Sequence, residues 1–367
     1  MPPFRRLILL ALGLTVVAGL LSGCATGATI ASSWPGISAD ETTVYVAYNN
    51  AVSAIDLENG VERWHYPAEA ERNRSFYATP LVTADGQIVV GGYDHTLTVL
   101  DAESGAEIWR FTEATARIIG SPTAAGSLVL VPSADHHLYA LDLETRQVAW
   151  TFETEQALWT APLVDGETVY LPSMDHNLYA IRLSDGAEIW RADLGGGSVD
   201  TPTLVEGTLL AGTFGNGLQA VSANTGAILW SFETVGWIWG NPTAADGLVY
   251  FGDVAGWVYS LRLGSSGEEI SRFQPDGPVA SSPAYGDDRI FISTESGTVY
   301  ARTASTGDPI WEQSIGLTSR LYTDPLLVGD VLLVASTTAR QGDAILTAFD
   351  AASGARRWVF PPPAPEE

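Results

Sequence analysis

The sequence has 367 residues, and its 43 acidic side chains against 18 basic ones give a net charge of −25 at pH 7. A surface this acidic repels phosphate backbones, so we expect no nucleic-acid partner. The single cysteine, Cys24, excludes an internal disulfide and a zinc site built from several cysteines.

The N-terminal segment predicts export. Two arginines, Arg5 and Arg6, precede the apolar stretch Leu7–Leu21, which is short for a membrane-spanning helix. We interpret residues 1–23 as a signal peptide. Cys24 follows a Leu-Ser-Gly tripeptide and resembles the lipid-attachment cysteine of bacterial lipoproteins. An ordinary signal peptide that happens to be cut near a cysteine, or an uncleaved anchor, is the alternative.

Lipidation of Cys24 predicts a place in the bacterial cell envelope. The protein would face the periplasm from the outer membrane, or sit on the outer leaflet of the cytoplasmic membrane in a cell without an outer membrane. Residues 24–33 would form the tether. Because anionic lipids repel an acidic body, we expect the lipid to be the main membrane attachment.

A repeat then occupies residues 34–360. Its core is an apolar residue, Ala, Asp, a Ser/Thr-Gly turn and a tryptophan, in copies about 40–47 residues apart. One copy is degenerate, and we expect Ile270 to stand at its tryptophan position. The repeat tryptophans are Trp64, Trp109, Trp150, Trp190, Trp230, Trp311 and Trp358.

A second marker, a proline, recurs with the same step from Pro35 to Pro325, so there are eight copies. Within one copy, Gly, Asp and Asn turns separate an apolar segment at 163–164 from strands at 168–172, 178–183 and 188–192. Four short antiparallel strands per copy predict an all-β, eight-bladed β-propeller. Residues 361–367 would be a flexible tail, and both end copies are complete, which leaves the mode of ring closure open.

The motif Tyr-Ala-Leu-Asp-x-x-Thr-Gly-x-x-x-Trp after a Ser/Thr-Pro step resembles the PQQ-like, tryptophan-docking repeat family over residues 34–360. The resemblance implies that each repeat tryptophan packs between neighbouring blades and is structural. A large ring buried at every junction suits that role.

The resemblance covers two functional classes. One is the quinoprotein dehydrogenases, which hold pyrroloquinoline quinone and Ca²⁺ in the channel; the other is the non-catalytic lipoproteins of the outer-membrane assembly type represented by BamB. This chain has no adjacent cysteine pair, no recognisable calcium ligand set and only short insertions. We therefore expect no enzyme activity, no cofactor and no metal, and a monomeric propeller that binds a membrane-associated protein. A quinoprotein dehydrogenase or a small-ligand-binding propeller is the alternative.

Asp-His pairs recur in one turn of three consecutive copies, at 94–95, 135–136 and 175–176. Asp and His are good ligands for divalent metals. A tight turn that needs a left-handed residue explains them better, because His and Asn tolerate that conformation.

Aromatic and arginine side chains gather shortly before the prolines, in segments that connect one copy to the next. In a propeller these segments lie on one face around the channel mouth, and Trp, Tyr and Arg are typical of binding hot spots. The alternative is that these rings only pack between blades. The predicted partner-binding residues are Trp159, Trp237, Trp239, Tyr322, Tyr77, Arg117 and Arg320.

Overall fold

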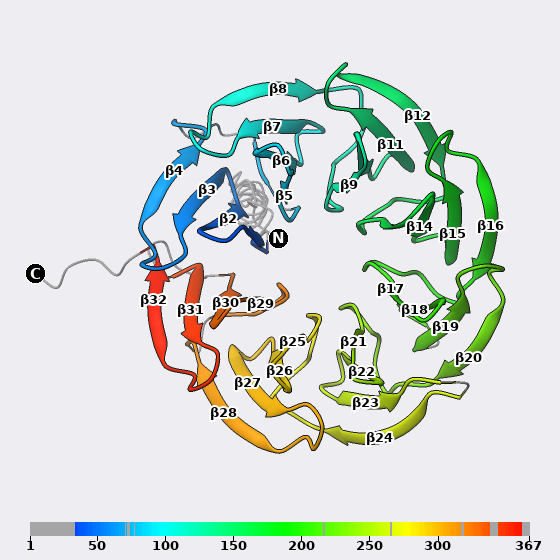
Figure 1. Ribbon diagram of the computed structural model, residues 1–367, viewed down its shortest axis with the longest axis vertical. Helices are drawn as coiled ribbons and strands as arrows, with labels where there is room; N and C mark the ends of the chain where they lie inside the picture. The colour runs from blue at the N-terminus through cyan, green and yellow to red at the C-terminus, as the bar shows by residue number, and fades with distance from the viewer. Residues whose placement is uncertain are drawn as a thin grey trace, which may run out of the picture. The chain divides into compact units, whose positions relative to one another are not determined.

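Eight four-stranded antiparallel sheets are arranged in a ring in the computed structural model (Figure 1). The structure describes residues 34–69, 71, 74–76, 78–215, 217–264, 266–316, 319–337 and 344–361. The predicted signal peptide 1–23, the tether 24–33 with Cys24, Tyr77 and residues 362–367 of the predicted tail lie outside these ranges. The predicted all-β, eight-bladed propeller is confirmed, and the described residues contain no helix.

Each sheet is one blade, formed by four strands that follow one another in the chain. Blades 1 to 4 consist of β1 (Gly36–Ala39), β2 (Thr43–Tyr48), β3 (Ala51–Asp56), β4 (Glu62–Tyr66); β5 (Leu81–Val82), β6 (Gln87–Gly91), β7 (Leu97–Asp101), β8 (Glu107–Phe111); β9 (Thr123–Ala125), β10 (Leu128–Pro132), β11 (His137–Asp142), β12 (Gln147–Glu153); and β13 (Leu163–Asp165), β14 (Thr168–Pro172), β15 (Asn177–Arg182), β16 (Glu188–Asp193).

Blades 5 to 8 consist of β17 (Thr203–Val205), β18 (Thr208–Gly212), β19 (Leu218–Ser222), β20 (Ile228–Phe232); β21 (Thr243–Ala245), β22 (Leu248–Gly252), β23 (Val258–Arg262), β24 (Glu268–Phe273); β25 (Ala284–Gly286), β26 (Arg289–Ser293), β27 (Thr298–Thr303), β28 (Pro309–Ser314); and β29 (Leu326–Val328), β30 (Val331–Ala335), β31 (Leu346–Asp350), β32 (Arg356–Phe360). The four segments expected in the fourth copy correspond to β13–β16 within one or two residues.

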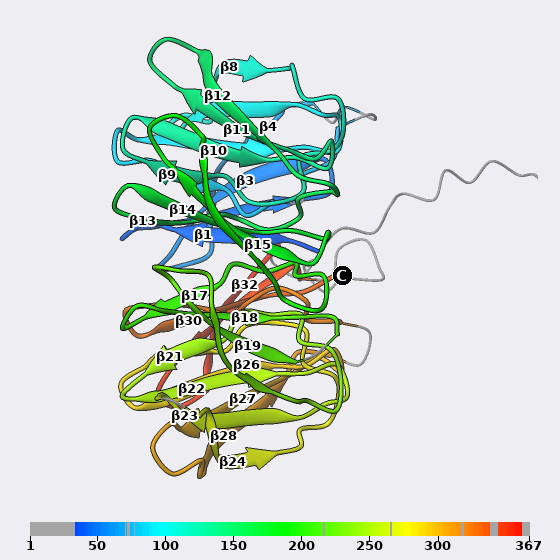
Figure 2. The same ribbon diagram turned by 90° about the vertical axis from the view of Figure 1, so that its right-hand side faces the viewer.

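The position of a strand in its blade explains its composition. The second and third strands, such as β14 and β15, lie between neighbouring blades and are buried almost throughout, so they are nearly continuous apolar runs. The outer strands, such as β16, bury only some residues, and polar side chains occupy most of their exposed positions. Figure 2 shows blades 4 and 5 side by side in this arrangement.

The repeat tryptophans lie where one blade meets the next. In six of the described junctions the indole N–H donates a hydrogen bond to a backbone carbonyl of the following blade; Trp150, for example, reaches the Leu183 oxygen at 2.7 Å. The ring lies against the turn glycine of that blade, and a Cβ on Gly186 would come within 2.7 Å of the Trp150 ring. Gly186 also has φ 73°, so both the space and the backbone require glycine.

Trp109 packs at a junction where the turn glycine is replaced. Arg146, with φ 60°, stands where the other turns have glycine. No hydrogen bond from the Trp109 indole nitrogen is present within the described part of the chain, although Trp109 packs against the same buried apolar cluster as Leu143 and Val148. This junction therefore has apolar packing without the polar anchor.

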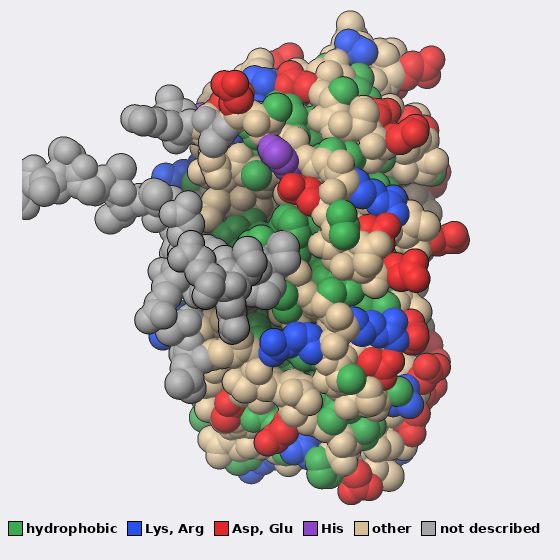
Figure 3. All heavy atoms as spheres, turned by 90° about the vertical axis from the view of Figure 1, so that its left-hand side faces the viewer, with side chains coloured by type: hydrophobic (Ala, Val, Ile, Leu, Met, Phe, Trp, Pro, Cys, Tyr) green, Lys and Arg blue, Asp and Glu red, His purple; other side chains and the backbone are tan. Residues whose placement is uncertain are grey.

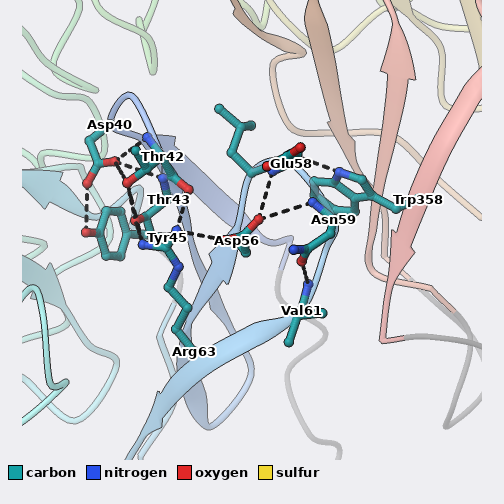
Figure 4. Close-up of polar contacts among 11 residues, drawn as sticks. Asp40, Thr42, Thr43, Tyr45, Asp56, Glu58, Asn59, Val61, Arg63 and Trp358 are labelled. Carbon is teal, nitrogen blue, oxygen red and sulfur yellow. Dashed lines mark hydrogen bonds and ion pairs between the residues drawn. The ribbon is translucent and has the colours of Figure 1, made fainter.

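The ring closes with the same kind of contact and with no shared strand. Trp358 of blade 8 donates to the Leu57 oxygen of blade 1 at 2.9 Å, and Figure 4 shows its ring beside the turn at Glu58 and Asn59. A Cβ on Gly60 would come within 2.7 Å of the Trp358 ring. At the inner edge, the Thr323 hydroxyl donates to the Pro35 oxygen at 2.5 Å. One apolar cluster joins strands of both blades across this junction.

The degenerate junction lies between blades 6 and 7, and the prediction for its tryptophan position is wrong by one residue. In seven blades the tryptophan pairs across the ladder with the third strand, as Trp190 does with Ala180. The equivalent pair in blade 6 is Ser260 with Ser271, whereas Ile270 points outward and is 40% exposed. Ile270 is the large apolar residue next to this position, but the usual spacing of four residues from the turn glycine, here Gly267, reaches Ser271.

Arg302 partly fills the space at the junction between blades 6 and 7 that a tryptophan occupies at the other junctions. It occupies a position that is buried and apolar in the other blades, such as Ile181 in blade 4. Its guanidinium carbon lies 3.9 Å from the centre of the Phe273 ring, and Nη1 donates to the Gly307 oxygen at 2.9 Å. Its Nε is buried without a partner, and a gap of about 20 Å³ remains beside Ser271.

Restoring this tryptophan should stabilise the ring. We expect the double variant Ser271→Trp/Arg302→Leu to raise the free energy of unfolding by about 1–3 kcal/mol, because it buries an indole and removes an unpaired Nε. Chemical denaturation measures the change. The matched control is Ile270→Trp, which adds the same ring at an exposed site; a gain in the control but not in the double variant would contradict the assignment of Ser271.

Candidate functional site

The segments that connect the outer strand of one blade to the inner strand of the next, here called connectors, are hydrogen-bonded to one face of the ring. Before blade 3, the Thr115 N–H donates to the Asp135 carboxylate at 2.7 Å, and the Ala134 N–H donates to the Arg117 oxygen at 2.9 Å. Ala134 and Asp135 belong to the turn between β10 and β11, the second and third strands of blade 3. The connectors and these turns therefore share a face.

The turn aspartates have a structural role in this fastening. Asp135 and Asp175 each accept one bond from a connector N–H and another from a tyrosine hydroxyl of their own blade, at 2.9 and 2.8 Å for the tyrosine bonds. The histidines that follow have left-handed backbones, with φ 67° at His95, 76° at His136 and 74° at His176. The turn interpretation is confirmed for these histidines, and no group of three or more potential metal ligands occurs among the described residues.

The connectors bring most of the predicted aromatic residues together around one cavity. A central cavity of about 360 Å³ is lined by residues from all eight blades. Six of its lining residues stand three positions before a repeat proline: Ile119, Trp159, Val199, Trp239, Ala280 and Tyr322. The residue that holds this position in blade 2 is Tyr77, which lies outside the described residues.

An aromatic cluster leads from this cavity to the surface. The Phe214 ring lies between Trp239, at 5.3 Å between ring centres, and Trp237, at 5.6 Å. Trp34 meets the edge of Trp239 at 6.5 Å. Trp237 is 55% exposed, and Trp159 on the cavity wall is 37% exposed. Part of this aromatic surface is therefore open to solvent.

Comparison with known proteins identifies the family. The sequence profile of the outer membrane protein assembly factor BamB matches residues 49–201, 178–263 and 254–366. The chain belongs to the BamB family. No individual curated protein matches its sequence.

Solved structures with the same fold include BamB itself. The crystal structure of BamB from Moraxella catarrhalis has a TM-score of 0.68 and 20% sequence identity, and the match covers 85% of this chain and 92% of that one. A computationally designed protein, Ika8, has a TM-score of 0.72 and 15% identity over 87% of this chain and 97% of its own. At these identities the structures show a common fold only.

The predicted arginines of this BamB-family propeller lie at the rim. The Arg117 guanidinium stands 4.7 Å from the centre of the Tyr93 ring. Arg320 Nη1 lies 3.7 Å from a Glu295 carboxylate oxygen, which also accepts a bond from the Tyr322 hydroxyl at 3.5 Å. Both arginines are exposed. The structure joins Arg320 to Tyr322 through Glu295 but shows no contact between Arg117 and the aromatic cluster.

Sequence reasoning missed three residues of this site in the BamB-family chain. Phe214 was overlooked because it lies in a turn, although its repeat position is that of Ala134 and Met174, which also meet a connector. Asp200 and Asp324 line the cavity two residues and one residue before their repeat prolines. Most copies have a small or hydroxyl residue there, and that break in the repeat was the available signal.

Proposed function

We propose that this BamB-family protein is a non-catalytic, monomeric, lipid-anchored binding protein of the cell envelope. It binds a membrane-associated protein partner through the connector face and acts in the assembly of outer-membrane proteins. Family membership supports the general role. The observation that carries the choice of surface is the aromatic cluster Trp34–Trp239–Phe214–Trp237, which continues from the cavity wall to an exposed ring.

The charges elsewhere on the ring are poor anchors for a partner. Figure 3 shows carboxylates and arginines interspersed on the side where blades 1 and 8 meet. There, Arg357 pairs with Asp330 at 2.6 Å and Asp350 at 2.7 Å, and Arg63 pairs with Asp56 at 2.8 Å. Exposed pairs such as these contribute little each. Burial of large aromatic rings contributes much more, which favours the connector face.

Membrane attachment through a lipid on Cys24 completes the proposal. Cys24 and Trp34 are about ten residues apart, so an extended tether reaches roughly 35 Å. The propeller would then work close to the membrane surface, facing the periplasm if the cell has an outer membrane. The part of the chain that the structure describes contains no helix long and apolar enough to cross a membrane.

Substitution of Trp237 tests the binding face. We expect Trp237→Ser to weaken partner binding about 30-fold or more, as for a hot-spot tryptophan, with an unchanged melting temperature because the ring is already 55% exposed. In a deletion strain of the source bacterium, the variant should fail to restore outer-membrane protein levels. A photo-crosslinking residue at position 237 should lose its adducts when Trp159 is also replaced.

Leu229→Ser is the matched control, because Leu229 is 50% exposed on the outer strand β20, away from the connectors. It should restore outer-membrane proteins like the wild type. If Trp237→Ser restores them equally well, the partner does not bind this face. If Trp237→Ser instead lowers the melting temperature strongly, the ring serves packing.

A further inference from the structure

The central cavity concentrates hydrogen-bond acceptors in its wall. Asp200 and Asp324 both line it, and Ser282 links them: its N–H donates to Asp324 at 2.6 Å, and its hydroxyl lies 3.4 Å from an Asp200 oxygen. The Asn241 side-chain oxygen is buried in the same wall and has no hydrogen-bond partner. The cavity is thus lined by two carboxylates, whereas the Asn241 oxygen beside it is closed off from solvent.

No described cation balances the two carboxylates. Neither Asp200 nor Asp324 forms an ion pair with a described arginine or histidine, and their hydrogen-bond donors are neutral backbone and hydroxyl groups. Burial raises the pKa of Asp200 well above its usual range, and the nearby charge of Asp324 raises it further. Burial also raises the pKa of Asp324. Two acids side by side in the cavity wall, without a described cationic partner, are costly to the fold.

The remaining wall is suited to a cation as well. Trp34, Trp159 and Trp239 line the cavity, and an indole face attracts a positive charge, more strongly when water is excluded. The volume of about 360 Å³ is within the range of small-molecule sites. Aromatic faces together with unpaired carboxylates form the environment that binds ammonium and guanidinium groups.

We propose that the central cavity of this propeller binds an organic cation, an alkylammonium or guanidinium group, between Asp200 and Asp324 and the indole rings of Trp159 and Trp239. Anions are excluded by the two carboxylates. A hard metal ion fits less well, because Ca²⁺ takes six to eight oxygen ligands and the tryptophans supply none.

Titration calorimetry with butylguanidinium, on the full-length protein in detergent, tests the proposal directly. Butylurea is the matched neutral probe, since it has a similar shape without the charge. We expect butylguanidinium to bind at one site per propeller and butylurea not to bind. Equal heats from the two probes, or no saturable binding of either, would overturn the proposal.

Variants place the binding in the cavity. Asp200→Asn should weaken butylguanidinium binding about tenfold or more, while Asp287→Asn, which removes a carboxylate that is 89% exposed, should leave it unchanged. Equal loss in both variants would mean that overall charge alone attracts the probe. Asp200→Asn should also raise the melting temperature of the unliganded protein, because it removes one of two neighbouring acids that have no described cationic partner; a merely structural aspartate would lower it.

The cation site shares Trp159 and Trp239 with the proposed partner face but does not include Trp237. Trp237 belongs to that face but does not line the cavity. Trp237→Ser should therefore keep butylguanidinium binding even where partner binding is lost. Loss of probe binding in this variant would contradict a site confined to the cavity.

Discussion

Replacing Trp358 by alanine should lower the free energy of unfolding by about 3–5 kcal/mol, the usual cost of removing a buried tryptophan. The indole fills the junction between blades 8 and 1, donates to the Leu57 oxygen and covers Gly60. Its loss leaves a cavity and an unpaired carbonyl at the one junction that no connector crosses within the described residues. Urea denaturation followed by fluorescence of the remaining tryptophans measures the change.

Trp109→Ala is the internal comparison for this prediction. Trp109 packs at its junction without the indole hydrogen bond and faces Arg146 rather than glycine. We expect a loss smaller by about 1 kcal/mol, the net contribution of one hydrogen bond. If Trp358→Ala costs no more than an exposed substitution, the tryptophan does not hold the ring closed.

Replacing Cys24 by serine should release the protein from membranes completely. A serine cannot carry the thioether-linked lipid, and the acidic propeller is repelled by anionic lipid surfaces. Two acyl chains give stable anchoring that the body cannot replace. Fractionation of cells that produce the wild type and the variant measures the distribution between membrane and soluble fractions.

Ala25→Ser serves as the control, because it changes the neighbouring residue and keeps the cysteine. It should remain in the membrane fraction. Membrane association of Cys24→Ser that survives a high-salt wash would show a second attachment. If both variants are soluble, the cysteine is not the anchor and an ordinary signal peptide explains the N-terminal segment.

The fold could be predicted because a propeller repeats its local chemistry. In most copies a glycine in the docking turn is followed four residues later by a tryptophan, and the step of about forty residues allows four short strands. The exception is informative. At Ser271 the repeat has no tryptophan, and the prediction fell on Ile270 because that neighbour is large and apolar, although it lies only three residues after Gly267 instead of four.

The candidate site could be predicted only in part. Trp159, Trp239 and Tyr322 were accessible because they share one repeat position, and the structure places all three on the cavity wall. Asp200 and Asp324 lie in different blades, at two different offsets from the proline, so no regularity in the sequence associates them. Their proximity comes from closing eight blades into a ring, which is a long-range property of the fold.

Within the described residues, blades 8 and 1 share no strand and no connecting segment, so the junction between them differs from the other seven. At seven junctions a covalent segment ties neighbouring blades, so separation there is limited by the length of the chain. Between blades 8 and 1, only side chains such as Trp358 and Thr323 resist separation, and parting them breaks no backbone ladder. We therefore expect the contact between blades 8 and 1 to open before the other junctions do, either when a ligand enters or at the start of unfolding, while the sheet of every blade stays intact.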